Sequence, residues 1–206
     1  GGPGAGVLGV RAFLEDYLPV PRVVNRGHKY AFDYSQRKSV GSIRYCYGNF
    51  GMLVRAYSYI KSWGSSLKTV SDNAILNANY LLRLLKDEFL VPYDRICAHE
   101  FVISSKGLGE RSALDIAKRL LDYGFHPPTI YFPLTVKEAL MIEPTETESK
   151  ETLDKFAWAL KKIACELKEK PDFVRASPHT KSIGRLDEVS AARKPNLRWT
   201  PKVEPA

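Results

Sequence analysis

The sequence predicts an α/β protein, with a local α+β layout in which helices cover one face of a small, mostly antiparallel sheet. Amphipathic stretches with apolar residues at three- and four-residue spacing indicate the helices, and short runs rich in β-branched and aromatic residues indicate the strands. A chain of 206 residues is long enough for one sizeable core or two small ones.

The first part of the chain is predicted to be rich in loops and then helical. Glycines within residues 1–9, and the prolines and glycine of residues 19–27, indicate loops on either side of a short helical stretch at Arg11–Tyr17. Residues 49–63 repeat apolar side chains at helical spacing, and Gly64 follows them. We therefore expect a helix there that ends at the glycine.

A second helix is expected to begin at Ser71 and Asp72, whose side chains are suited to capping it. The same helix carries Asn73, Asn77 and Asn79, where a simple surface helix would have Glu or Lys. Buried amides need hydrogen-bond partners, and a subunit interface is the place where we expect them.

The second half begins with a predicted strand at Glu100–Ser104 and a helix from Ser112 through Tyr123. Ser112 and Asp115 have the spacing of a capping box, so they are expected to open that helix. Gly124 is expected to end it, because glycine adopts the left-handed conformation that closes many helices.

Two further strands are predicted at Ile130–Val136 and Ala139–Glu143, joined as a tight antiparallel hairpin. Pro133 would place its strand at a sheet edge or a bulge. The last helix is expected to start near Thr147 and to end in lysines that suit its dipole. Beyond Pro171 the apolar periodicity stops, which predicts a basic, extended tail that wraps a surface or frays.

Composition excludes several classes of protein. The formal net charge of +8 raises the question of a nucleic-acid partner, but the basic residues are scattered and are not interleaved with aromatic residues. No apolar run approaches the roughly 18 residues of a membrane span. The three cysteines are widely spaced and form no Cys-x-x-Cys pair, which favours a reducing compartment and makes a metal site improbable.

Several segments together resemble one known family, the glycine decarboxylase, or P protein, of the glycine cleavage system. They occur in the family's order from the first residue to about Leu160, and the run Asp115–Thr129 is the most specific of them. The residues that carry the resemblance are Gly1–Gly4, Ala74–Tyr80, His99–Phe101, Asp115–Thr129 and Met141–Glu148. The tail segment Arg185–Glu188 is similar to the second subunit of the two-subunit form.

The resemblance implies the C-terminal part of a pyridoxal-phosphate-dependent enzyme with the fold-type-I, transferase-like fold. Such an enzyme removes carbon dioxide from glycine and transfers the aminomethyl group to the lipoyl arm of the H protein. It implies three regions: the end of the large cofactor-binding domain with an interdomain helix at 1–68, a small α/β domain at 69–170, and the tail at 171–206. The division itself is expected between Ser65 and Asp72.

The resemblance also implies where the cofactor is held. In the family, the lysine that binds pyridoxal phosphate lies a few residues before the glycine-rich stretch that opens this chain, so no catalytic lysine is assigned here. Gly1, Gly2 and Gly4 are expected to form a wall of the cofactor pocket, or otherwise only a tight turn. Gly48 and Asn49 precede a helix whose N-terminus is suited to the phosphate of a neighbouring subunit's cofactor, or they are an ordinary helix start.

Three more residues are candidates for lining a pocket. His99 and Glu100 stand at the start of a predicted strand, where a structural role is the alternative. His126 lies in a turn made stiff by the two prolines that follow it, which suggests either a structural role or a place near the lipoyl entrance.

The leading hypothesis is therefore part of a glycine dehydrogenase (decarboxylating), with the N-terminal portion or subunit 1 of the P protein, the lipoylated H protein and glycine as partners. A dimer or heterotetramer is expected. The alternative is a non-catalytic interaction module or truncated fragment without the cofactor lysine, and a nucleic-acid-binding domain is a third reading that rests on net charge alone. The expected location is the cytoplasm of a bacterium or archaeon, or the mitochondrion of a eukaryote.

Overall fold

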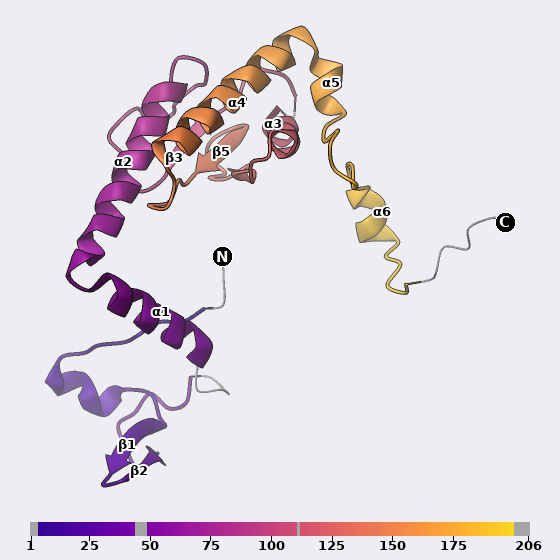
Figure 1. The fold of residues 1–206 in the computed structure, drawn as a ribbon. Coiled ribbons are helices and arrows are strands. Elements are labelled where there is room, and N and C mark those ends of the chain that lie inside the picture. The colour runs from indigo at the N-terminus through magenta and orange to yellow at the C-terminus, as the bar shows by residue number, and fades with distance from the viewer. Residues whose placement is uncertain (1–3, 44–48, 111, 200–206) are drawn as a thin grey trace. The chain divides into compact units, whose positions relative to one another are not determined.

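The computed structural model describes residues 4–43, 49–110 and 112–199 (Figure 1). The chain divides into two units, residues 1–67 and residues 68–206, each of which makes its contacts mainly within itself.

The first unit begins with a short 3-10 helix and a two-stranded sheet. The 3-10 helix, Ala12–Tyr17, confirms the short helical stretch predicted there. Strands β1 (Arg22–Arg26) and β2 (Lys29–Asp33) pair antiparallel, with Arg26 opposite Lys29. The prediction of a loop in this region was therefore wrong. Gly27, with φ +75°, opens the two-residue turn of a hairpin instead of marking a loop.

Helix α1 (Phe50–Trp63) ends at Gly64, which has φ +52°, as the sequence predicts. A one-turn 3-10 helix, Gly64–Ser66, leads into α2 (Leu67–Leu85). The predicted start of α2 at Ser71 and Asp72 was wrong. Asp72 lies inside the helix and forms an ion pair with Lys68 one turn earlier, at 2.6 Å, instead of capping the helix.

The sheet of the second unit has three short antiparallel strands in the order β3-β5-β4. They are β3 (Phe101–Ser104), β4 (Thr129–Ile130) and β5 (Ala139–Ile142), with Ile103 and Ile130 both opposite Leu140. The antiparallel pairing is confirmed, but the strand predicted to reach Val136 stops at Ile130. Residues 131–138 form a loop that contains Pro133, which has no N–H to give to a strand ladder.

Helices α3 (Ser112–Asp122) and α4 (Lys150–Glu169) complete the core of the second unit. Their inward faces carry Ile116, Leu120, Leu160 and Ile163, none of which is exposed. Gly124 has φ +81°, in agreement with its predicted role as a stop. Helix α4 starts three residues later than predicted, with Ser149 accepting a hydrogen bond from the Thr152 amide.

The predicted capping box of α3 was wrong, because a distant residue caps this helix. A carboxylate oxygen of Glu138, at the end of the 131–138 loop, accepts from the Ala113 amide at 2.9 Å. The Ser112 hydroxyl instead donates to the Ser105 carbonyl at 3.0 Å, and Asp115 pairs with Arg185 at 2.7 Å.

The region predicted to be an extended tail contains two short helices, α5 (Pro171–Arg175) and α6 (Glu188–Arg193). Between them, residues 177–185 form a strap along α3. One carboxylate oxygen of Asp122 accepts from the His179 and Thr180 amides, both at 2.7 Å, and from the Thr180 hydroxyl at 2.9 Å. The prediction that this part wraps a surface is correct for the strap.

Candidate functional site

The glycine-rich entry and the start of α1 meet in the first unit. Gly1, Gly2 and Gly48 lie outside the described residues, whereas Gly4 and Asn49 lie within them. The side-chain amide of Asn49 donates to the Gly4 carbonyl at 2.6 Å, although the two are 45 residues apart in the chain. The structure thus brings together two of the residues that the resemblance assigns to cofactor binding.

The Asn49 side chain makes no capping bond to α1. The backbone carbonyl of Asn49 accepts from the Met52 and Leu53 amides at 3.0 and 3.2 Å. A Cβ placed on Gly4 or Gly51 would meet no heavy atom within 4 Å. Helix N-termini in general present free backbone amides to anions.

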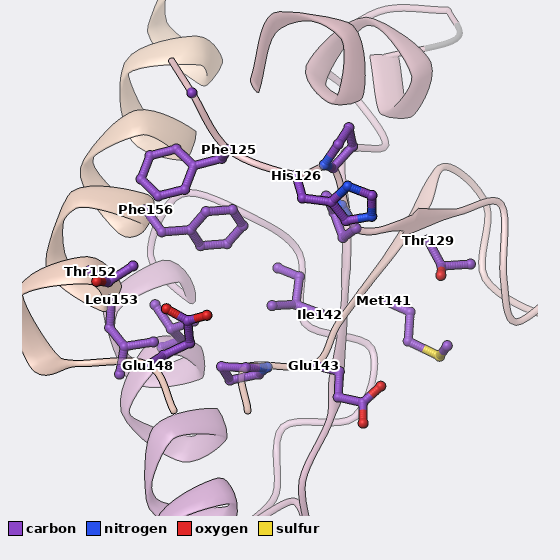
Figure 2. Close-up of a pocket in the computed structure, with 15 residues that line it drawn as sticks. Phe125, His126, Thr129, Met141, Ile142, Glu143, Glu148, Thr152, Leu153 and Phe156 are labelled. Atoms are coloured by element: carbon purple, nitrogen blue, oxygen red, sulfur yellow. The ribbon is translucent and has the colours of Figure 1, made fainter. Parts of the chain in front are cut away.

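A separate pocket of about 400 Å³ lies in the second unit (Figure 2). Helices α2 and α4 form one side of it, and the turn after α3 and the end of β5 form the other. Its residues are Leu81, Gly124–Thr129, Met141–Pro144, Glu148, Thr152, Leu153 and Phe156.

The polar members of this pocket include one predicted residue and lie next to another. His126 lines the pocket, as does Glu143. His99 is not a lining residue, but its Nε2 atom is 3.9 Å from a Glu143 carboxylate oxygen, with both side chains more than half exposed. Glu100 is not among the lining residues either, although it directly precedes β3.

An asparagine of α2 holds the backbone of residues 145–148, the segment before α4 that includes the lining residue Glu148. The Asn77 side chain donates to the Thr145 carbonyl at 2.9 Å and to the Glu148 carbonyl at 3.2 Å. Asn79 forms a reciprocal pair with the backbone of Cys97, at 2.8 and 3.0 Å. These two asparagines therefore have hydrogen-bond partners within their own chain, contrary to the expectation of a subunit interface.

An ion-pair network elsewhere in the second unit shifts the pKa values of its members. Arg119 contacts Asp122 and Glu166, each at 2.9 Å, and its guanidinium lies 4.9 and 4.7 Å from the ring centres of Tyr123 and Phe173. Burial would raise the pKa of Asp122, but hydrogen bonds from Thr180, Arg119 and His179 outweigh it and lower the pKa to about 2. Both carboxylates contact the one guanidinium and accept further hydrogen bonds, from Thr180 to Asp122 and from Tyr123 to Glu166, so this network is structural.

The described part of the chain contains neither a metal-binding cluster nor a membrane-spanning helix. Its His, Cys, Asp and Glu residues form no group of three or more placed to hold a metal ion. None of its helices combines the length and the apolar character needed to cross a membrane.

Comparisons with known proteins identify the family of the chain. A sequence model of the family described as "Glycine dehydrogenase, C-terminal domain" matches residues 70–179. The chain is 58% identical over 203 residues to a protein named "Probable glycine dehydrogenase (decarboxylating) subunit 2" from Halalkalibacterium halodurans, covering 97% of this chain and 41% of the relative. Proteins of the same name from Caldanaerobacter subterraneus and Desulforamulus reducens are 55% and 54% identical, covering 97% and 98% of this chain and 42% and 43% of those relatives.

The chain thus spans about two-fifths of the length of the relatives that it matches. The family model covers most of α2, all of α3, α4 and α5 and the three-stranded sheet, and it ends inside the strap, before α6. By sequence, and by a mixed α/β structure with small antiparallel sheets, the chain belongs to the family of the glycine dehydrogenase (decarboxylating) C-terminal domain, as found in subunit 2.

Proposed function

We propose that this chain supplies the C-terminal part of subunit 2 of a glycine dehydrogenase that decarboxylates glycine and transfers the aminomethyl group to the lipoyl arm of the H protein. Similarity over nearly the whole chain to proteins with that name is the observation that carries the proposal. Residues 1–68 would then be the end of the large cofactor-binding domain with the interdomain helix, and residues 69–170 the small domain.

Pyridoxal phosphate would supply the electron sink for decarboxylation. For this chain we propose that Gly1, Gly2 and Gly4 form a wall of the cofactor pocket. Gly48 and Asn49, at the start of α1, would hold the phosphate of a neighbouring subunit's cofactor. The hydrogen bond from Asn49 to Gly4 supports this role, because it holds the glycine-rich segment next to the helix N-terminus. We assign no catalytic lysine within the chain.

The proposed partners follow from the names of the relatives and from exposed surface. A protein named subunit 2 implies a subunit 1, and we propose a heterotetramer or dimer that also receives the lipoylated H protein and glycine. None of the described residues of the first unit is buried, and large apolar side chains such as Phe50 are 77% exposed. Such surface is typical of an interface. The bacterial relatives support a cytoplasmic location.

The decisive experiment is a glycine and carbon dioxide exchange assay on the complete polypeptide, assembled with subunit 1, pyridoxal phosphate and lipoylated H protein. Exchange that depends on all four components is the expected result. An assembly that binds subunit 1 but catalyses no exchange would favour the non-catalytic interaction module instead.

A further inference from the structure

The pocket of the second unit has rigid apolar walls that the proposed enzyme activity does not use. The rings of Phe125 and Phe156 meet edge to face with centres 5.2 Å apart. Leu153 and Ile142 lie beside them and are only 3% and 4% exposed. Figure 2 shows these four side chains around one space. Packing of this kind favours a preformed cavity, which is the usual form of a small-molecule site.

One carboxylate faces these walls without a partner. In Figure 2 the Glu148 carboxylate lies next to Leu153, below the two phenylalanine rings, whereas the Glu143 carboxylate points away from them. Among the described residues, Glu148 forms no ion pair. The two nearest lysines along the chain are already engaged, Lys150 with Asp154 and Lys155 with Glu151, each at 2.7 Å.

The backbone of Glu148 is also fixed. Its carbonyl accepts from the Asn77 side chain at 3.2 Å, and the same amide holds Thr145 at 2.9 Å. The backbone that carries this exposed side chain is therefore held at the edge of the cavity.

From this geometry we propose that the pocket binds a primary alkylammonium ion, a compact organic cation with a short apolar chain. The ammonium group donates to the Glu148 carboxylate, and the chain lies against Phe125, Phe156 and Ile142. The apolar rings exclude water from the alkyl chain, which favours its burial there. A volume of about 400 Å³ holds such a ligand, and the two carboxylates at the rim disfavour an anion of the same shape.

This binding is independent of the proposed enzyme activity, because residues of this chain alone contact the ligand. The test uses the complete polypeptide in its natural assembly, with labelled methyl groups, and follows the Leu153 and Ile142 resonances by NMR during titration. The probes are n-butylammonium, neutral n-butanol and the anion butyrate. Saturable shifts of both methyl groups are expected with n-butylammonium, together with weaker binding of n-butanol and no binding of butyrate.

The substitution Glu148→Gln keeps the shape of the side chain and removes its charge. The affinity for n-butylammonium should fall about three- to tenfold, because the charged hydrogen bond is lost, while the affinity for n-butanol should stay unchanged. The control Glu151→Gln removes an exposed charge in the first turn of α4, outside the pocket, and should have no effect. Equal affinities for n-butylammonium and butyrate, or wild-type affinity in Glu148→Gln, would overturn the proposal.

Discussion

The contact between Asn49 and Gly4 predicts how cofactor retention depends on one side chain. Replacing Asn49 with Leu removes the donor to the Gly4 carbonyl, so no hydrogen bond from Asn49 holds the glycine-rich segment at the start of α1. In the complete enzyme, the expected result is a several-fold weaker affinity for pyridoxal phosphate, measured by cofactor absorbance after dialysis. Ser62→Ala, on the same helix, is the control. Unchanged affinity in Asn49→Leu would remove this residue from the cofactor site.

Asp122 gives a prediction on the dependence of stability on pH. Its folded pKa of about 2 lies below the ordinary value of 3.8, so its contribution is complete above pH 3.8 and falls as the pH is lowered toward 2. The shift corresponds to about 2 kcal/mol, because one pKa unit is about 1.4 kcal/mol, and about half of this remains at pH 3. The side chain is only 3% exposed, so solvent screens it little.

The measurement compares thermal unfolding of the wild type and Asp122→Asn at pH 7 and at pH 3. The difference in melting temperature between the two proteins should be about half as large at pH 3. Asp172→Asn, at a side chain that is 95% exposed, should show little difference at either pH. A difference between wild type and Asp122→Asn that does not change with pH would contradict the prediction.

At the scale of elements, the strap along α3 depends on Arg185. This side chain pairs with Asp115, which is 5% exposed, and also donates to the Ser177 carbonyl at 3.0 Å. Arg185→Met leaves a buried carboxylate without its cation, which is expected to lower the free energy of unfolding by about 2 to 3 kcal/mol. Urea unfolding of the second unit, followed by the fluorescence of Trp158, measures the change.

The matched control for this variant is Arg175→Met. Arg175 also pairs with an aspartate, Asp172, but both side chains are more than half exposed. Its removal should change the free energy of unfolding by less than about 0.5 kcal/mol. If both variants are equally stable, residues 177–185 are not held to α3 in solution as the structure has them.

The long helices were largely predictable from the sequence, whereas the short helices α5 and α6 and several other elements were not, for physical reasons. Helical periodicity and terminal glycines are local signals, so α1, α3 and α4 could be located within a few residues. The cap of α3 comes from Glu138, 25 residues after Ala113, and the partner of Asp115 is Arg185, 70 residues later. Such long-range partners leave no periodic trace, and the capping-box spacing was misleading for that reason.

The pocket of the second unit could also be predicted only in part from the sequence. His126 could be singled out because prolines fix the turn after it, but Glu148 resembled an ordinary acid before a helix start. Only the tertiary structure shows that its carboxylate lies beside Leu153, and that Asn77, on another helix, holds its backbone. The convergence of α2, α4 and β5 depends on packing and not on spacing along the chain.

At the scale of the whole molecule, the described part of the first unit has no core of its own. Its described residues include none that is buried, and α1 exposes apolar side chains around much of its surface, for example Phe50 at 77% and Tyr57 at 65%. A helix that is apolar on most sides is normally buried in a larger structure. The second unit, in contrast, has a continuous buried core from Ala78 to Val174. The two units therefore differ in how strongly they depend on the rest of the enzyme.

This difference predicts that these 206 residues alone neither catalyse glycine decarboxylation nor bind pyridoxal phosphate at a specific site. The start of α1 offers a place for the phosphate, but a working site also needs a lysine that holds the cofactor covalently, a pocket around its ring and an acid at its pyridinium nitrogen. We assign none of these three to the described residues. Exposed lysines react loosely with any aldehyde, so a yellow sample decides nothing.

The informative measurement is borohydride trapping at low cofactor concentration, followed by peptide mapping, beside a glycine and carbon dioxide exchange assay with lipoylated H protein. The isolated chain should show scattered, substoichiometric labelling and no exchange, whereas the complete assembly treated in the same way should label one lysine and exchange carbon dioxide. Stoichiometric trapping at a single lysine of the isolated chain, together with exchange, would place the catalytic centre within these residues. The first unit would then have to form its own pocket, despite the absence of any buried residue among those described.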